Sequence, residues 1–60
     1  MSFNPGDLVK HITSGERGVF LWISQRKMEG GVPEYSRIST DFNGTIEIPS
    51  ICLEKVEEDQ

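Results

Sequence analysis

Residues 18–23, Gly-Val-Phe-Leu-Trp-Ile, form the longest apolar run of the chain. The run is rich in β-branched and aromatic residues, follows a glycine-containing turn at 15–18 and ends in polar residues, which is typical of a strand near the centre of a sheet. It is too short and too poor in strong helix formers to make a helix on its own. A chain of only 60 residues is therefore expected to build a single small β domain around this segment.

Alternating or β-branched segments separated by turn residues predict four further strands. The predicted strands cover 8–12, 18–23 with an extension toward Lys27, 34–40, 45–48 and 52–56. The segment 28–33 holds two glycines and a proline, so it is expected to be a connection and a candidate functional loop. Pro49 ends the fourth strand, and residues 49–51 are long enough for one tight helical turn. We expect an all-β fold with five strands and at most this one helical turn before the last strand.

The alternation in the later strands predicts which side chains face the interior. Ser36, Ile38 and Thr40 share one face of the third strand, and Ile46 and Ile48 are expected to point inward from the fourth. Leu53 is the expected buried residue of the last strand. In the segment 8–12 apolar residues occupy both faces, so the inward face stays open there.

The Asn-Gly pair at 43–44 is the strongest hairpin signal in the chain. A three-residue loop over 42–44 is favoured over a two-residue loop, because it pairs Ile38 with Ile48 and gathers the apolar residues on one face. The same loop requires Gly44 to adopt a left-handed conformation, which glycine tolerates without steric strain.

The central apolar run can take two phases in a strand. In the first phase the interior is filled by Val19, Leu21 and Ile23, and Phe20 and Trp22 project outward. In the second phase Phe20 and Trp22 lie inside. The polar residues that follow Ile23 do not extend the alternation, so both phases stay open.

The first phase predicts an exposed aromatic patch that includes an arginine. The candidate protein-binding residues are Phe20, Trp22, Tyr35 and Arg37. Aromatic residues and arginine are the residue types enriched at interface hot spots. The alternative is that the segment around Phe3, or the loop at 28–33, folds over the rings and makes them a second small core.

The charge balance bears on the class of partner. The formal net charge of −4 disfavours general binding to a phosphate backbone, which depends on clustered Lys and Arg. A local basic edge is the alternative, and its candidate nucleic-acid-binding residues are Arg17, Arg26, Lys27 and Arg37. Residues 57–60 are acidic and are expected to form a frayed tail after a domain that spans 1–56.

The sequence offers little for catalysis or for cofactor binding. Cys52 is the only cysteine and His11 the only histidine, which excludes an intramolecular disulfide and disfavours a metal cluster. As a pair they are more typical of a small apolar residue and a histidine at the core edge than of a nucleophile and its base. A domain of this size also leaves little room for a pocket of several hundred cubic ångströms. We expect no catalytic residue, no metal and no cofactor, and thus no enzyme.

The sequence also bears on cellular location. The lone cysteine favours a reducing compartment. The first residues lack the basic start and apolar core of a signal peptide, and no apolar run approaches the ~20 residues that span a bilayer. A cytoplasmic protein that does not contact a membrane is expected.

Two stretches resemble the SH3-like small β-barrel superfamily. Residues 5–11 (Pro-Gly-Asp-Leu-Val-Lys-His) and 15–20 (Gly-Glu-Arg-Gly-Val-Phe) resemble the opening Gly-Asp-x-Val…Gly-x-x-Gly-x-Val of bacterial Tudor-like and KOW-like barrels. Residues 44–56 resemble the distal hairpin, Pro-Ser turn and last strand of signalling SH3 domains. The resemblance implies a five-stranded SH3-like barrel.

Departures from signalling SH3 domains limit what the resemblance implies about ligands. The aromatic first strand of those domains is absent, and Ile51-Cys52 replaces the Asn-Tyr after the Pro-Ser, so binding of proline-rich peptides is not implied. Our first hypothesis is a module that docks on a larger protein or self-associates. The alternatives are a KOW-like or Tudor-like module that accompanies nucleic acid in transcription, repair or translation, and a small accessory subunit of an enzyme or electron-transfer complex.

Overall fold

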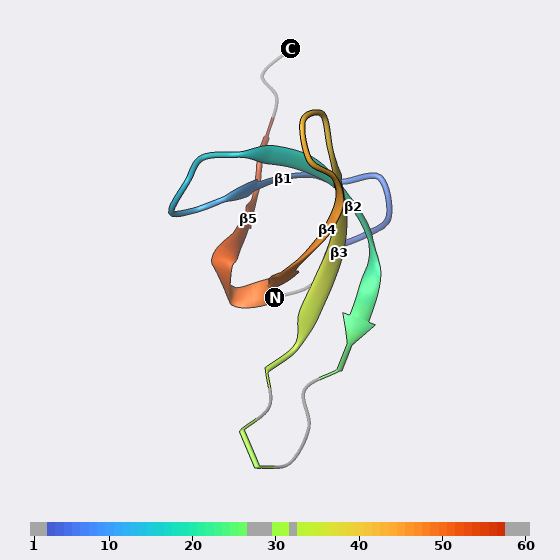
Figure 1. Ribbon diagram of the computed structural model, residues 1–60, viewed down its shortest axis with the longest axis vertical. Coiled ribbons are helices and arrows are strands. Elements are labelled where there is room, and N and C mark those ends of the chain that lie inside the picture. The colour runs from blue at the N-terminus through green and yellow to red at the C-terminus, as the bar shows by residue number, and fades with distance from the viewer. Residues whose placement is uncertain (1–2, 27–29, 32, 58–60) are drawn as a thin grey trace.

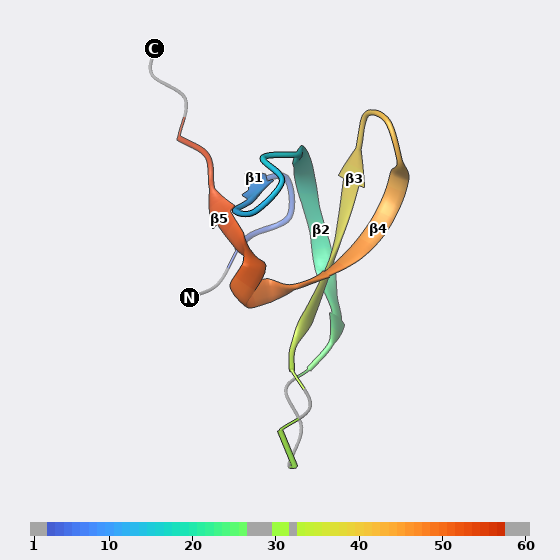
Figure 2. The ribbon, with the colours of Figure 1, turned by 60° about the vertical axis from the view of Figure 1, so that its left-hand side comes forward.

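A single antiparallel sheet forms the framework of the computed structural model, which describes residues 3–26, 30–31 and 33–57. Its elements, in chain order, are β1 (Leu8–His11), β2 (Arg17–Gln25), β3 (Tyr35–Thr40), β4 (Gly44–Pro49), the 3-10 turn η1 (Ser50–Cys52) and β5 (Leu53–Lys55) (Figure 1). The strand order is β4-β3-β2-β1-β5. Figure 2 shows that the sheet is strongly curved. The prediction of five strands with one helical turn before the last is confirmed.

Strand β2 lies at the middle of the sheet and is its longest strand, with 9 residues. Its first residues pair with β1, where Leu8 lies opposite Val19, and it pairs with β3 over most of its length. The predicted central strand at 18–23 is therefore confirmed, and it continues to Gln25. An irregularity in β2 beyond Val19 therefore changes its register with β3.

The hydrophobic core takes one buried apolar residue from each strand. These residues are Val9, Phe20, Ile38, Ile48 and Leu53. Around them pack the partly buried Phe3, Ile23, Ile46 and Cys52. The predicted inward positions on β3, β4 and β5 are confirmed, and Val9 identifies the inward face of β1, which its sequence pattern left open. With so few buried side chains, each contributes a large share of the stability.

The segment before β1 folds back against the centre of β2. Asp7 organises the turn, because its Oδ2 accepts a bond from the Asn4 amide at 2.9 Å. The Gly6 amide donates to the Phe20 carbonyl at 2.9 Å, and the Phe20 amide donates to the Asp7 carbonyl at 2.8 Å. This pairing brings the Phe3 ring to 5.6 Å from the Phe20 ring, centroid to centroid. Phe3 therefore packs on Phe20 at the edge of the one main core, and these two rings do not form the second small core that was considered as an alternative.

The hairpin between β3 and β4 has the predicted faces but a different register. Ile38 lies opposite Ile46 rather than Ile48, and the loop covers 41–43 rather than 42–44. The change moves the pairing by two residues, and because side chains alternate with a period of two, the same apolar face is kept. Gly44 has a φ of +65°, so its predicted left-handed conformation is confirmed.

The Thr40 hydroxyl accounts for the observed loop. Its Oγ1 accepts a bond from the Asn43 amide at 3.0 Å and donates to the Gly44 carbonyl at 2.8 Å. These two bonds close the loop directly after Thr40, so the ladder ends at the pair Thr40–Gly44. A buried threonine at the end of β3 therefore decides the register, which the hydrophobic pattern alone could not do.

The turn η1 is fastened to the start of β3. The Ser50 amide donates to the Glu34 carbonyl at 2.9 Å, and the hydroxyls of Ser36 and Ser50 lie 2.6 Å apart in a hydrogen bond. Ser36 is fully buried, so this bond satisfies a hydroxyl that water cannot reach. The predicted helical turn at 49–51 lies one residue later, and the last strand is shorter than the predicted 52–56.

Gly18 allows β2 and β3 to approach closely, so we expect Gly18→Ala to destabilise the domain. A methyl group at this buried position would meet the Ser39 carbonyl oxygen at 2.7 Å. Overpacking of this kind costs about 1–3 kcal/mol. Urea denaturation measures the change. In open space the same substitution would raise stability, since alanine restricts the unfolded chain. A stabilised variant would therefore contradict the close approach.

Candidate interaction surface on strands β2 and β3

A β-bulge interrupts β2 between its two aromatic residues. Phe20 lies opposite Ile38, whereas Trp22 lies opposite Arg37, so Leu21 is an extra residue on β2. A bulge resets the alternation of side chains along its strand. Phe20 and Trp22 consequently point to opposite faces, with Phe20 2% exposed and Trp22 56% exposed.

The bulge shows that neither simple phase of the central run was right. The outward position expected for Phe20 is wrong, and so is the inward position expected for Val19, which is 37% exposed. Trp22 points outward and Ile23 packs against the core, as the first phase predicted. Up to Phe20 the strand follows the second phase, and beyond Leu21 it follows the first.

Trp22 shares the outer face of the sheet with two of the other predicted patch residues. Directly opposed residues of adjacent strands project to the same face. Trp22 therefore lies beside Arg37, and Tyr35 occupies the same face of β3 two residues away. We call Trp22, Tyr35 and Arg37 the outer-face strip. Three of the four predicted residues are thus brought together, and Phe20 is separated from them because it belongs to the core.

A second irregularity in β2 brings Gln25 opposite Tyr35. The register shifts again between Ile23 and Gln25. Ser24 lies within this shift, and its hydroxyl donates to the Tyr35 carbonyl at 3.4 Å, which links it to β3. The Gln25 side chain donates to the Pro33 carbonyl at 3.1 Å and so links the end of β2 to the chain that enters β3.

The electrostatics of the strip are set by a cross-strand ion pair. The Nη2 atom of Arg37 lies 3.5 Å from Oε2 of Glu47, which is opposite it on β4. A surface pair of this kind adds little stability. Its main effect is to keep the guanidinium in a preferred position next to Trp22 and to offset its charge.

The predicted basic edge does not gather at one place among the described residues. Arg17 is the first residue of β2 and Arg26 follows its last, so about 25–30 Å of extended strand separates them. Both are exposed. Arg37 lies between them but is paired with Glu47. Lys27 lies outside the described residues.

A separate groove lies near η1, and sequence reasoning missed it. It has a volume of about 610 Å³ and is lined by Phe3, Gly31, Pro33, Glu34, Ser50, Ile51 and Leu53. The expectation that so small a domain leaves little room for a pocket of several hundred cubic ångströms is therefore wrong. The lining comes from three segments that are distant in sequence. The only signal in the sequence was the glycine and proline content of the 28–33 loop.

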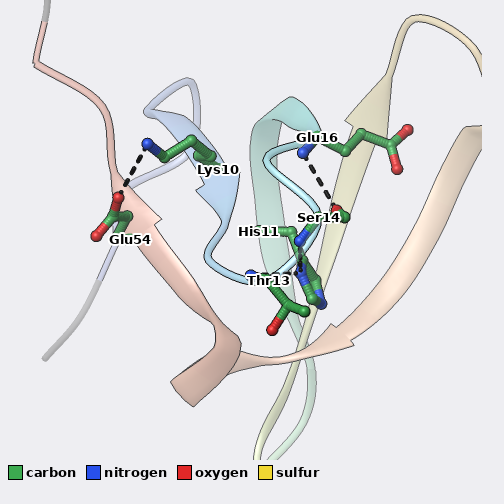
Figure 3. A network of polar contacts seen from close by, with 6 residues as sticks. All are labelled: Lys10, His11, Thr13, Ser14, Glu16 and Glu54. Carbon is green, nitrogen blue, oxygen red and sulfur yellow. Dashed lines mark hydrogen bonds and ion pairs between the residues drawn. The ribbon is translucent and has the colours of Figure 1, made fainter.

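The only Cys–His pair of the chain is not joined by its side chains. His11 Nδ1 accepts bonds from the amides of Thr13 and Ser14, at 3.2 Å each (Figure 3). Within the described part of the chain, no hydrogen bond joins the Cys52 thiol to this imidazole. Cys52 is a free, partly buried thiol that packs against the core.

Residues 3–26, 30–31 and 33–57 contain neither a metal-binding cluster nor a membrane-spanning helix. In these ranges no three His, Cys, Asp or Glu side chains are grouped so that they could hold a metal ion. They also contain no helix with the length and apolar character needed to cross a membrane.

Comparison with known proteins does not place the chain in a family. No protein-family model, curated protein or solved structure gives a significant match. The described residues offer two candidate functional surfaces, the outer-face strip and the groove near η1.

Because the two aromatic residues lie on opposite faces, their replacement is expected to lower stability by very different amounts. We expect Phe20→Ala to lower the free energy of unfolding by about 3–5 kcal/mol, because it empties the centre of the core. Trp22→Ala should lower it by less than about 1 kcal/mol, since more than half of that side chain is in water. Thermal and urea denaturation of the two variants test this, and an unfolded Trp22→Ala protein would show that Trp22 belongs to the core.

Proposed function

We propose that the protein is a small non-catalytic interaction module that docks on a larger protein through the outer-face strip. One observation supports this most strongly: the only tryptophan is 56% exposed in a row with Arg37, next to Tyr35. A tryptophan left in water contributes little to folding, whereas at an interface its large apolar surface can be buried. Trp, Tyr and Arg are also the residues that most often dominate binding energy.

We further propose that the curved sheet is an SH3-like small barrel. Support comes from the strand order β4-β3-β2-β1-β5, in which the last strand lies beside the first, and from the 3-10 turn that precedes it. A core with one buried residue from every strand also favours this architecture. The sequence resemblance at residues 5–20 and 44–56 points the same way.

A protein partner is favoured over nucleic acid by the distribution of charge. The net charge of −4 repels a phosphate backbone, and the described arginines do not form a continuous track. Arg37, the arginine beside Trp22, already has Glu47 as its counter-ion. A protein surface can pack on the rings without needing an unpaired cation.

The test compares capture of partners by the wild-type domain and by Trp22→Ala from extracts of the native source. We expect Trp22→Ala to reduce recovery of a specific partner at least 10-fold, which corresponds to about 1.4 kcal/mol and is modest for a hot spot. Quantitative mass spectrometry identifies the partner, and the interaction is then measured with purified proteins by calorimetry. Sedimentation of the isolated domain tests whether the partner is a second copy.

Two matched controls make the test specific. Phe42 is 91% exposed at the β3–β4 loop, and Ile51 is 84% exposed on the groove near η1. Phe42→Ala and Ile51→Ala each remove an exposed apolar side chain away from the strip, and both should bind as the wild type does. If Ile51→Ala loses the partner while Trp22→Ala keeps it, the groove is the binding surface and the strip is not.

Nucleic acid is tested separately by titration at low salt, where electrostatic attraction is strongest. We expect no binding of single-stranded or duplex nucleic acid. Binding that weakens with salt and is lost in a variant with both Arg17 and Arg26 changed to Ala would contradict the proposal and favour the KOW-like or Tudor-like alternative.

A further inference from the structure

The loop between β1 and β2 closes around the only histidine of the chain. Two backbone bonds define the loop, from the His11 amide to the Glu16 carbonyl and from the Gly15 amide to the His11 carbonyl, both at 2.8 Å. The Ile12 amide adds a bond to the Cys52 carbonyl at 2.9 Å. At the tip of the loop, the amides of Thr13 and Ser14 bond to a side chain and not to the backbone.

The tip of the loop is held by the imidazole ring. The amides of Thr13 and Ser14 both donate to His11 Nδ1, at 3.2 Å each, and Figure 3 shows the ring lying against these two residues. Nδ1 is an acceptor only while the imidazole is neutral and carries its proton on Nε2. In the imidazolium both ring nitrogens carry a hydrogen and act as donors. Nδ1 could then no longer accept the bonds from the Thr13 and Ser14 amides, because its own hydrogen would point at theirs.

We propose that this loop is a pH-responsive element that opens when His11 gains a proton. Histidine is the side chain whose charge ordinarily changes between about pH 5 and 8. The ring-anchored tip is present while the imidazole is neutral and is lost as the pH falls. The two backbone bonds at the base of the loop do not depend on the ring, so the change is local and the sheet persists.

The charges around His11 leave the imidazolium without a direct partner. Charged or titratable groups on the adjoining segments are Lys10 on β1, Glu16 just before β2, Arg17 at its start, Cys52 on η1, and Glu54 and Lys55 on β5. Lys55 lies 4.0 Å from the Asp7 carboxylate. Glu54 is engaged by Lys10 at 3.2 Å, and Glu16 by the Asn43 side chain at 2.7 Å. Among the described residues no carboxylate forms an ion pair with His11. No ion pair therefore holds the charged ring in place.

The β1–β2 loop is also linked to the β3–β4 loop, through the side chain of Glu16. The Ser14 hydroxyl accepts a bond from the Glu16 amide at 3.2 Å, and the Glu16 carboxylate accepts one from the Asn43 side chain. Asn43 adjoins the exposed ring of Phe42. The His11 amide holds the Glu16 carbonyl, so this link between the two loops does not depend on the imidazole ring.

Amide exchange with solvent, measured residue by residue by NMR from pH 8 to pH 5, tests the proposal. Each rate is divided by the intrinsic rate of that residue at the same pH, and the ring protons of His11 report its titration. We expect the protection of the Thr13 and Ser14 amides to fall about 3- to 10-fold as the pH is lowered, as loss of a hydrogen bond predicts. The pH midpoint of this fall should coincide with the midpoint observed for the His11 ring protons. Gly15, which bonds to the His11 carbonyl, is the internal control and should change much less.

Two variants separate protonation from other effects of pH. His11→Asn supplies an uncharged acceptor at the same distance along the side chain, so its loop should stay protected at both pH values. His11→Ala has no acceptor, and Thr13 and Ser14 should be unprotected throughout. The proposal is overturned if the protection of the Thr13 and Ser14 amides in the wild-type protein does not change while the ring titrates. This result comes from the wild type alone, so it does not depend on whether either variant folds. It is also overturned if His11→Asn shows the same loss at low pH.

Discussion

The bulge at Leu21 allows the central strand β2 to place one aromatic residue in the core and the next on the outer face of the sheet. Without it, strict alternation would place Phe20 and Trp22 on the same face, and the sheet would have either two rings inside or two rings outside. With it, Phe20 fills the core and Trp22 lies in solvent. Because β3 pairs with β2 across the bulge, it follows the same division: Arg37 is placed beside Trp22 while Ile38 remains buried.

Side-chain acceptors that cap backbone amides shape the turns around this sheet. Asp7 accepts from Asn4 before β1, His11 accepts from two amides after it, and Thr40 accepts from Asn43 after β3. Each acceptor satisfies amides that have no partner in a strand, which is how short loops of polar residues become ordered. The three differ in chemistry. Only the imidazole acceptor can be switched off by a proton near neutral pH, and this sets the β1–β2 loop apart from the other two.

The two candidate surfaces differ in how they are built. The outer-face strip lies on two adjacent strands, so the rigid sheet holds its side chains in position and little ordering is needed on binding. The groove near η1 is assembled from the N-terminal segment, the approach to β3 and the 3-10 turn. An interaction module can use both, but the strip places Trp, Tyr and Arg together, and that composition is the stronger argument for a protein partner.

The sequence by itself determined the features that depend on local pattern. It predicted five strands, the tight turn before the last, the buried face of β3 and β4, and Gly44 in a left-handed conformation, because alternation and turn chemistry act over a few residues. Only the tertiary structure decided the rest. The bulge at Leu21 follows from pairing with β3, the hairpin register from the bonds of the Thr40 hydroxyl, and the groove from segments that meet only in the folded chain. Trp22 points outward for that reason: its direction depends on how β2 pairs with β3, and no pattern within residues 18–23 records that pairing.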